Sequence, residues 1–214
     1  GFKAEIFDSR PVTLDGGPVE VRAQNRTEVR GAQMADGEVN DTGNPLDIAM
    51  QGDVLLAVQA PDGSEAYTRR GDLSISPTGV LQTGDGLPVI GDAGPVTVPL
   101  GGDVAIAPDG AILLSDPAVP EAAPERIGRL KLASAAGSDL VKGLDGQFRV
   151  RGGGILPEDL DAKLITGALE GSNVVSSEVL VEMIEAQRLF EIRTNVVSTA
   201  RDLDESAARL MRLS

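Results

Sequence analysis

The stretch Ser176–Ser214, SSEVLVEMIEAQRLFEIRTNVVSTARDLDESAARLMRLS, decides the fold of this 214-residue chain. Its apolar residues recur at three- and four-residue spacing, which predicts one long amphipathic helix. Ser176 or Ser177 can cap the free amides of its first turn, and Glu178 lies where the helix dipole favours an anion. Arg212 lies at the opposite end, where the dipole favours a cation.

This helix carries two apolar stripes. One is a coiled-coil-like seam that contains Leu189, Ile192, Val196, Leu203 and Leu210. The second is offset by one residue, about 100° around the axis. The candidate subunit-interface residues come from both stripes: Val179, Met183, Leu189, Phe190, Ile192, Val196, Val197, Leu203, Leu210 and Met211.

A helix with two apolar faces needs at least two neighbours. Burying one Leu or Val side chain is worth about 1.5–3 kcal/mol, so exposure of both stripes would be unfavourable. A single docking site on the rest of the chain could cover one stripe but hardly both. The helix therefore favours a protein that packs into a multimeric assembly.

Residues 43–150 predict a compact β domain built from hairpins. A short strand, a turn with Pro and Gly, and a second strand recur three times. Pro presets φ at the first central turn position and Gly accepts the left-handed conformation, so these turns close hairpins. The three turns are Pro61-Asp62-Gly63, Pro77-Thr78-Gly79 and Pro108-Asp109-Gly110.

The remaining segments are expected to be connectors. Residues 1–42 are polar and extended in character, with a turn at Asp15–Pro18 and a strand at Val19–Ala23. Residues 151–175 are expected to lead back to the terminal helix at 176–214. The predicted fold class is mainly β with a long C-terminal α-helix, the hairpin domain being inserted between terminal, coiled-coil-like segments.

Composition excludes several functions. The chain has no Cys and no His, which removes thiol nucleophiles, imidazole bases and the usual zinc sites. Its net charge of −14 disfavours nucleic acid, and its aromatic content of 2% disfavours base stacking. We expect no cofactor, no metal, no small-molecule substrate and no catalytic residue. Arg22, Arg26 and Arg30 form either a solvated face or a contact to an acidic neighbour.

Acidic motifs in the chain predict turns. Asp-Gly dipeptides recur along the chain, but no window has the alternating ligands and closing Glu of an EF-hand. With 33 Asp and Glu residues, a chance pair of carboxylates carries little weight as a glycosidase site.

Several motifs together resemble those of the flagellar rod and hook proteins. The similarity runs from about residue 31 to the C-terminus. The motifs are TGNPLDIAMQG at Thr42–Gly52, YTRRG at Tyr67–Gly71, GVLQT at Gly79–Thr83, GLPV at Gly86–Val89, GALEGSNV at Gly167–Val174 and EMIEAQR at Glu182–Arg188. Within that family, IGRLKL at Ile127–Leu132 and GLDGQFR at Gly143–Arg149 are most similar to the proximal-rod subunits, with the distal-rod subunits a weaker match.

The resemblance implies a structural, non-enzymatic subunit of the periplasm-spanning basal-body rod. Its partners would be other proximal and distal rod proteins and the flagellar type III export apparatus. The resemblance also implies that Gly1–Glu5 follows an N-terminal helix that this sequence lacks. In the family that helix packs with the C-terminal helix in an inner tube around the export channel.

One competing hypothesis remains from the residues alone. The chain could be a secreted β-domain binding module, or a hydrolase, whose C-terminal helix only dimerises.

Overall fold

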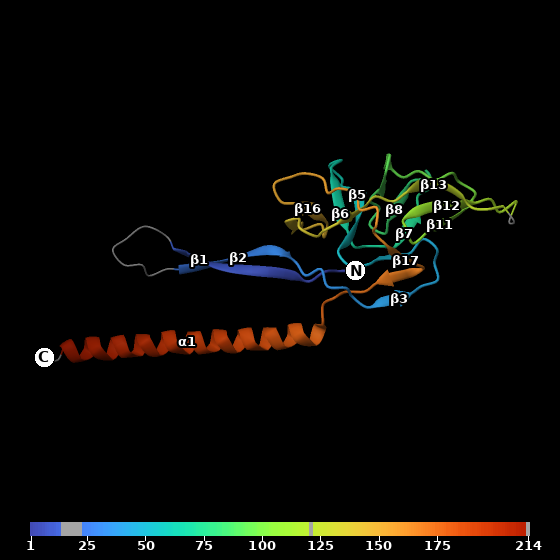
Figure 1. The fold of residues 1–214 in the computed structure, drawn as a ribbon. Helices are drawn as coiled ribbons and strands as arrows, with labels where there is room; N and C mark the ends of the chain where they lie inside the picture. Colours follow the sequence, from blue (N-terminus) through green and yellow to red (C-terminus); the bar gives the residue numbers. More distant parts are fainter. Residues whose placement is uncertain (14–22, 120–121, 213–214) are drawn as a thin grey trace. The chain divides into compact units, whose positions relative to one another are not determined.

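The computed structural model describes residues 1–13, 23–119 and 122–212, and within these it describes all side chains except those of 7–13, 23–30, 204 and 207–212. The chain divides into two compact units, Gly1–Asn173 and Val174–Ser214. The first is built from strands, and the second holds α1 (Ser176–Arg212), which is the only helix in the described part of the chain (Figure 1). The prediction of a mainly β chain with a long C-terminal helix is confirmed.

A five-stranded antiparallel sheet forms the centre of the first unit. Its order is β14-β5-β6-β16-β15. These strands are β14 (Leu132–Ser134), β5 (Val54–Gln59), β6 (Glu65–Thr68), β16 (Phe148–Val150) and β15 (Leu140–Lys142). β5 has the sequence VLLAVQ, an apolar run without alternation, as expected for a strand that is covered on both faces.

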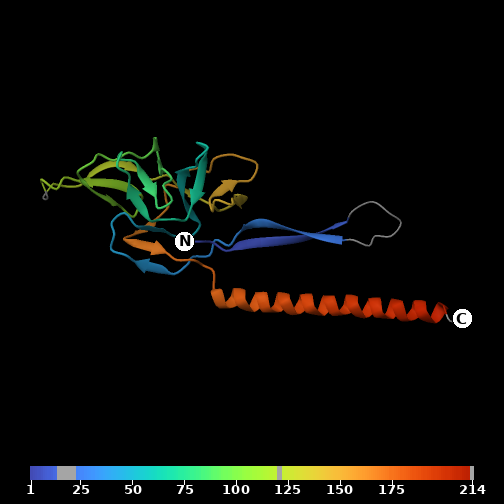
Figure 2. The ribbon, with the colours of Figure 1, turned by 180° about the vertical axis from the view of Figure 1, so that it is seen from behind.

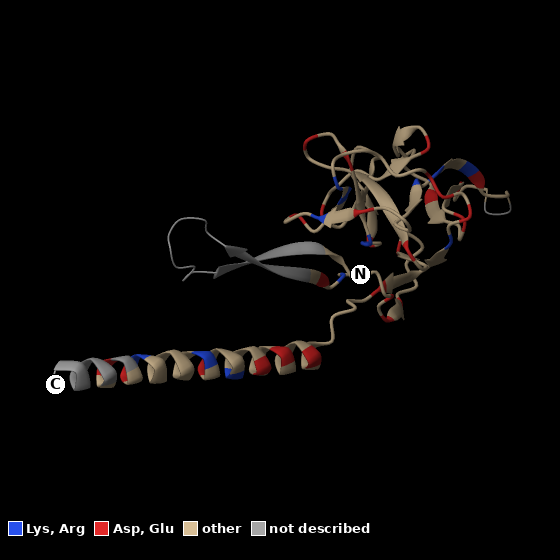
Figure 3. Cartoon of the chain, turned by 60° about the vertical axis from the view of Figure 1, so that its left-hand side comes forward, with Lys and Arg blue, Asp and Glu red and all other residues tan. Residues whose placement is uncertain are grey.

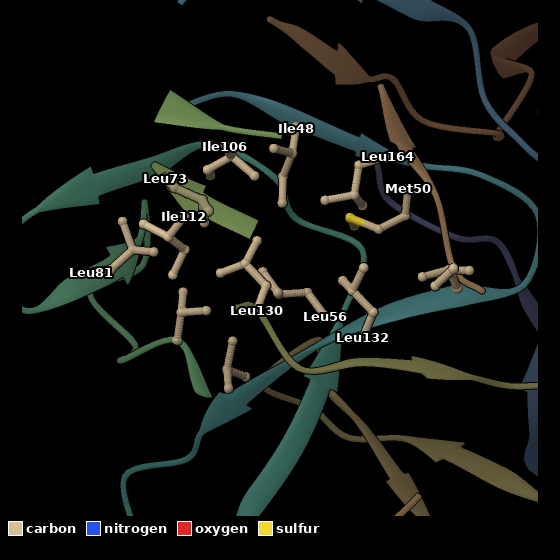
Figure 4. Close-up of a cluster of buried hydrophobic side chains, with 14 of the residues drawn as sticks. Ile48, Met50, Leu56, Leu73, Leu81, Ile106, Ile112, Leu130, Leu132 and Leu164 are labelled. Atoms are coloured by element: carbon tan, nitrogen blue, oxygen red, sulfur yellow. The ribbon is translucent and has the colours of Figure 1, made fainter. Parts of the chain in front are cut away.

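The two faces of β5 belong to two hydrophobic clusters. Because successive side chains of a strand point to opposite faces, Val54, Leu56 and Val58 enter one cluster. Leu55 and Ala57 enter the other, beside Tyr67, Phe148 and Leu156. The larger cluster is shown in Figure 4, where the labelled side chains are Ile48, Met50, Leu56, Leu73, Leu81, Ile106, Ile112, Leu130, Leu132 and Leu164.

Smaller sheets complete the larger cluster. A three-stranded antiparallel sheet has the order β11-β12-β13, and two hairpins pair β7 with β8 and β9 with β10. The strands are β7 (Leu73–Ile75), β8 (Leu81–Thr83), β9 (Ile90–Gly91), β10 (Gly94–Pro95), β11 (Asp103–Ile106), β12 (Ala111–Ser115) and β13 (Glu125–Arg129).

The three turns predicted from Pro and Gly are confirmed as hairpin turns. They join β5 to β6, β7 to β8 and β11 to β12. Gly63, Gly79 and Gly110 adopt φ values of 83°, 83° and 82°. Each donates its amide to the carbonyl three residues earlier, at 2.9 Å. The left-handed conformation that closes each turn is therefore supplied by glycine.

Replacing Gly79 with alanine is expected to destabilise the first unit by about 1–2 kcal/mol. Besides the strain at positive φ, an added Cβ would lie 2.7 Å from the carbonyl oxygen of Val98. Chemical denaturation measures the change. In the control Gly128→Ala, the new methyl would lie 3.9 Å from Ile112 Cδ1, an ordinary contact, so a shift within about 0.5 kcal/mol is expected. Equal shifts in both variants would contradict this account.

The compact unit extends beyond the expected 43–150 domain at both ends. β3 (Val39–Asp41) pairs with β18 (Ala168–Glu170), and β4 (Ile48–Met50) pairs with β17 (Leu164–Thr166). Blue and orange strands lie side by side in both views (Figures 1 and 2). Residues 39–41, 164–166 and 168–170 are therefore paired strands, because the returning chain supplies backbone hydrogen-bond partners to the short β3 and β4.

Residues 1–42 also differ from a plain connector. β1 (Glu5–Thr13) and β2 (Ala23–Ala32) form an antiparallel hairpin whose register shifts between Ile6 and Phe7. The predicted turn at 15–18 and most of the predicted strand at 19–23, together with Arg22, lie outside the described residues. The side chains of Arg26 and Arg30 are outside the described set as well, so their proposed contact stays a prediction.

Candidate assembly surface

Helix α1 begins at Ser176, with Val175 preceding its first turn. The Val175 carbonyl accepts the amides of Glu178 at 3.0 Å and Val179 at 3.2 Å. Glu178 lies in the first turn, where the helix dipole favours its charge. Hydroxyl residues inside the helix donate to the carbonyl four residues earlier, as Thr194 does to Phe190 at 2.8 Å, so they are tolerated there.

The predicted interface residues that the structure describes are all exposed on this helix. Phe190 is 72% exposed and Leu203 is 66% exposed, whereas a core position such as Leu56 is 0% exposed. The other predicted residues with described side chains are between 48% and 63% exposed: Val179, Met183, Leu189, Ile192, Val196 and Val197. Leu210 and Met211 lie in α1, but their side chains are outside the described set.

The helix has a further apolar group that the two-stripe prediction left out. Leu180, Val181 and Ile184 are 55%, 55% and 43% exposed. All three lie in the first turns of α1. At 100° per residue Leu180 and Ile184 fall away from both stripes, whereas Val181 lies within about 20° of Ile192, at the edge of the seam. The run Val179-Leu180-Val181 could have indicated this, because three consecutive apolar residues cannot all lie on one face of a helix. Near its start, α1 is therefore apolar around most of its circumference.

Within the described residues, no helix combines the length and hydropathy needed to cross a membrane. Within the same residues, no group of three or more acidic side chains is placed to hold a metal ion.

The first unit contains a buried charged cluster, which we call the Glu170 cluster: Lys3, Asp36, Arg69 and Glu170. Lys3 Nζ donates to Glu170 Oε1 at 2.7 Å, and Arg69 Nε donates to Glu170 Oε2 at 2.9 Å. The side chains of Lys3, Arg69 and Glu170 are each no more than 1% exposed. Arg69 also pairs with the more exposed Asp36 at 2.9 Å. Three distant segments are thus joined around one carboxylate.

The electrostatics of Glu170 follow from this geometry. Burial alone raises the pKa of its carboxyl, but hydrogen bonds from Arg69, Lys3 and the Gly37 amide outweigh burial and lower the pKa to about 2. Arg69 also donates to the backbone carbonyls of Met50 and Val54, at 3.1 and 3.0 Å, and of Gly52. Each buried polar group of the cluster is therefore satisfied, as a buried ion pair requires.

Asn173 completes the point where the chain leaves the first unit. Its side chain accepts the Ala4 amide at 2.7 Å and donates to the carbonyls of Gln33 and Ala35 at 2.7 and 3.0 Å. Its backbone amide donates to the Phe2 carbonyl at 3.1 Å. Arg69, Glu170 and Asn173 come from the sequence motifs YTRRG and GALEGSNV, which the fold thus brings together although about a hundred residues separate them.

A cavity of about 410 Å³ opens beside this cluster and is lined by Asp72, Asp85 and Asp145 among others. These three carboxylates are bound by arginine. Arg70 donates to Asp72 at 2.5 Å and to Asp85 at 2.7 Å. Arg149 donates to Asp145 at 2.7 Å, and this hydrogen bond lowers the pKa of Asp145. An ionised, arginine-bound carboxylate is poorly suited to general acid catalysis.

Comparison with known proteins agrees with the sequence resemblance. A family model described as "Flagellar hook protein FlgE/F/G D1 domain" matches residues 49–114, and one described as "Flagellar basal body rod FlgEFG protein C-terminal" matches residues 165–210. The first covers strands of the β unit, and the second covers the GALEGSNV motif and most of α1. A β unit of this kind with an exposed terminal helix defines a flagellar protein of the hook and rod class.

Similarity to individual relatives narrows the family further. The flagellar basal-body rod protein FlgF of Salmonella typhimurium (strain LT2) is 38% identical over 220 residues, which cover 100% of this chain and 87% of that protein. FlgF of Escherichia coli (strain K12) is 40% identical over the same shares. FlgG of Buchnera aphidicola subsp. Baizongia pistaciae is 32% identical over 78% of this chain and 65% of that protein. The chain belongs to the FlgF family of flagellar basal-body rod proteins.

Proposed function

We propose that this chain, a structural rod subunit of the flagellar basal body, builds the proximal rod by burying both stripes of α1 against helices of neighbouring subunits. One observation carries the proposal: eight predicted interface residues are about half exposed or more on a helix that forms a compact unit by itself. A helix of 37 residues with such a surface needs neighbours to cover it.

The mechanism is mechanical. Each copy would offer one stripe to one neighbour and the second stripe to another. Such contacts join unlike surfaces, so they propagate into a helical tube. The helices would surround the export channel, the β units would form an outer layer, and the stiff tube would transmit torque from the motor to the hook.

The partners follow from the same proposal. Other rod and hook subunits would supply the covering helices. The flagellar export apparatus would deliver the chain unfolded, and a chain without Cys cannot be trapped by disulfides on the way. No catalytic activity is proposed, because the carboxylates named at the cavity are held by Arg70 and Arg149.

Replacing Phe190 or Leu203 with aspartate is expected to abolish rod assembly. Each change puts a charge where the proposal buries an apolar side chain, a loss of several kcal/mol per contact. The measurement is swimming motility of cells that depend on this chain, with intact rods scored by electron microscopy. Motile cells with intact rods in either variant would overturn the proposal.

The matched control is Asn195→Asp. Asn195 is exposed on the same helix but lies about 80° from the centre of the seam, on the side away from the second stripe, so motility should persist. In all three purified variants the free energy of unfolding of the first unit should change by no more than about 0.5 kcal/mol. Under the competing hypothesis, a module whose helix only dimerises, cells would swim with either stripe altered.

A further inference from the structure

The seam of α1 is acidic where it begins. Glu178, Glu182 and Glu185 precede Leu189 and Ile192 at the same alternating spacing of four and three residues. At 100° per residue these five side chains lie within about 40° of one line along the helix. The glutamates are exposed, and no ion pair is formed by any of the three within the described residues. Figure 3 shows the acidic start of the helix, followed by its first basic residues.

The helix alone does not explain these glutamates. The dipole favours Glu178 but falls off within the first turn, so it gives little to Glu182 and Glu185. Like charges three and four residues apart also destabilise a helix slightly. A neighbour that covers the seam must therefore either leave the acidic first turns of the seam in water or place cations against them.

The same helix carries cations at its second stripe. Arg193 and Arg201 lie on either side of the line through Val179 and Val197, each within about 45° of it. They are eight residues apart, close to the seven that separate Glu178 from Glu185. The seam of one copy and the second stripe of another are thus complementary in charge and similar in spacing.

We propose that α1 packs parallel to a second copy of itself, seam against second stripe, with an axial offset of about 15 residues or 22 Å. Glu178 then faces Arg193 of the neighbour, and Glu185 faces Arg201. Packing without an offset would press the glutamates against Val179 and Met183, which would desolvate the charges without a partner. This proposal rests on the proposed function and adds to it the register between copies.

Cysteine cross-linking tests the register directly, because the chain has no native Cys. Glu182 lies on the seam, and Val197, 15 residues on, lies on the second stripe. Copies bearing Glu182→Cys and copies bearing Val197→Cys, with different tags, are expressed together and oxidised in isolated basal bodies. A cross-link between the two tags is expected. Cross-linking of Glu182→Cys mainly to itself, or equally well to the off-stripe control Ile184→Cys, would overturn the proposal.

Charge reversal tests the electrostatic part. Glu178→Arg with Glu185→Arg, and separately Arg193→Glu with Arg201→Glu, should each lower the cross-linked yield at least about fivefold at roughly 0.15 M salt. All four changes together should restore the yield to within about twofold, because the pairs are exchanged. Unchanged yield in both two-site variants, or no recovery in the four-site variant with helix content retained by circular dichroism, would contradict the register.

The failures are distinguishable. If Phe190→Asp abolishes assembly while the reversals leave yield and motility unchanged, the rod function stands and the register is wrong. If Phe190→Asp also leaves rods intact, the proposed function itself is wrong.

Discussion

Replacing Arg69 with methionine is expected to destabilise the first unit by about 3–5 kcal/mol, because it breaks a buried ion pair from one side. The carboxylate of Glu170 would keep Lys3 but lose the hydrogen bond from Arg69 Nε. The carbonyls of Met50, Gly52 and Val54 would also lose their guanidinium donor in a buried setting. Each orphaned buried group adds a desolvation penalty of about 1–3 kcal/mol, and relaxation recovers part of the total.

Arg70→Met is the matched control for this experiment. The adjacent arginine is also bound to carboxylates, Asp72 and Asp85, but its side chain is 44% exposed. Exposed ion pairs contribute about 0–1 kcal/mol, so the control should shift the free energy of unfolding by no more than that. Urea denaturation at neutral pH measures both variants. Similar shifts in the free energy of unfolding for the two variants would show that the burial of Arg69 does not increase its contribution to stability.

The parts of the fold that were predictable from the sequence depend on interactions between residues close together in the chain. The helix follows from apolar spacing within Ser176–Ser214, and the three hairpins follow from the φ preferences of Pro and Gly. The Asp-Gly turns follow as well. Asp62 accepts the Ser64 amide at 2.9 Å and Asp109 accepts the Ala111 amide at 3.1 Å, so both aspartates close local turns as expected.

The rest of the fold depends on contacts between residues far apart in the chain, and these contacts leave no local pattern in a single sequence. Glu170 and Arg69 are 101 residues apart and look like any two surface charges in a chain with 33 acidic residues. All three residues of β3, with the sequence VND, are exposed, so the strand lacks the alternation of buried and exposed residues that identifies a strand. It is a strand because β18 returns to pair with it. Boundaries placed at 43 and 150 cut off strands of this kind.

On helix α1, part of the exposed apolar surface was predictable from the sequence and part was not. The two stripes were predictable, because residues three and four apart share one face of a helix that has 3.6 residues per turn. The exposed Leu180 and Ile184 fall outside that pattern. They make the start of α1 apolar beyond the two stripes, whereas the later turns carry polar residues such as Asn195 and Ser198 on the remaining face.

Acidification from about pH 5 to about pH 2 is expected to remove about 3 kcal/mol of stability from the first unit through Glu170 alone. The folded state lowers the pKa of this carboxyl from 4.5 to about 2. A lowered folded-state pKa means that the unfolded chain binds the proton first, so stability falls as pH falls. The contribution is complete above about pH 4.5 and is lost progressively toward pH 2.

Glu170→Gln isolates this contribution from that of the other carboxyls. The variant should be less stable than the natural chain at pH 7, because Lys3 and Arg69 lose their buried counter-charge. Its stability should fall less steeply with acid, so that the two curves converge by about 3 kcal/mol between pH 4.5 and 2. Asp62 and Asp145, whose pKa values are also lowered, contribute equally to both curves. Urea titrations across this range measure the difference, and curves that stay parallel would show that Glu170 has the same pKa in both states.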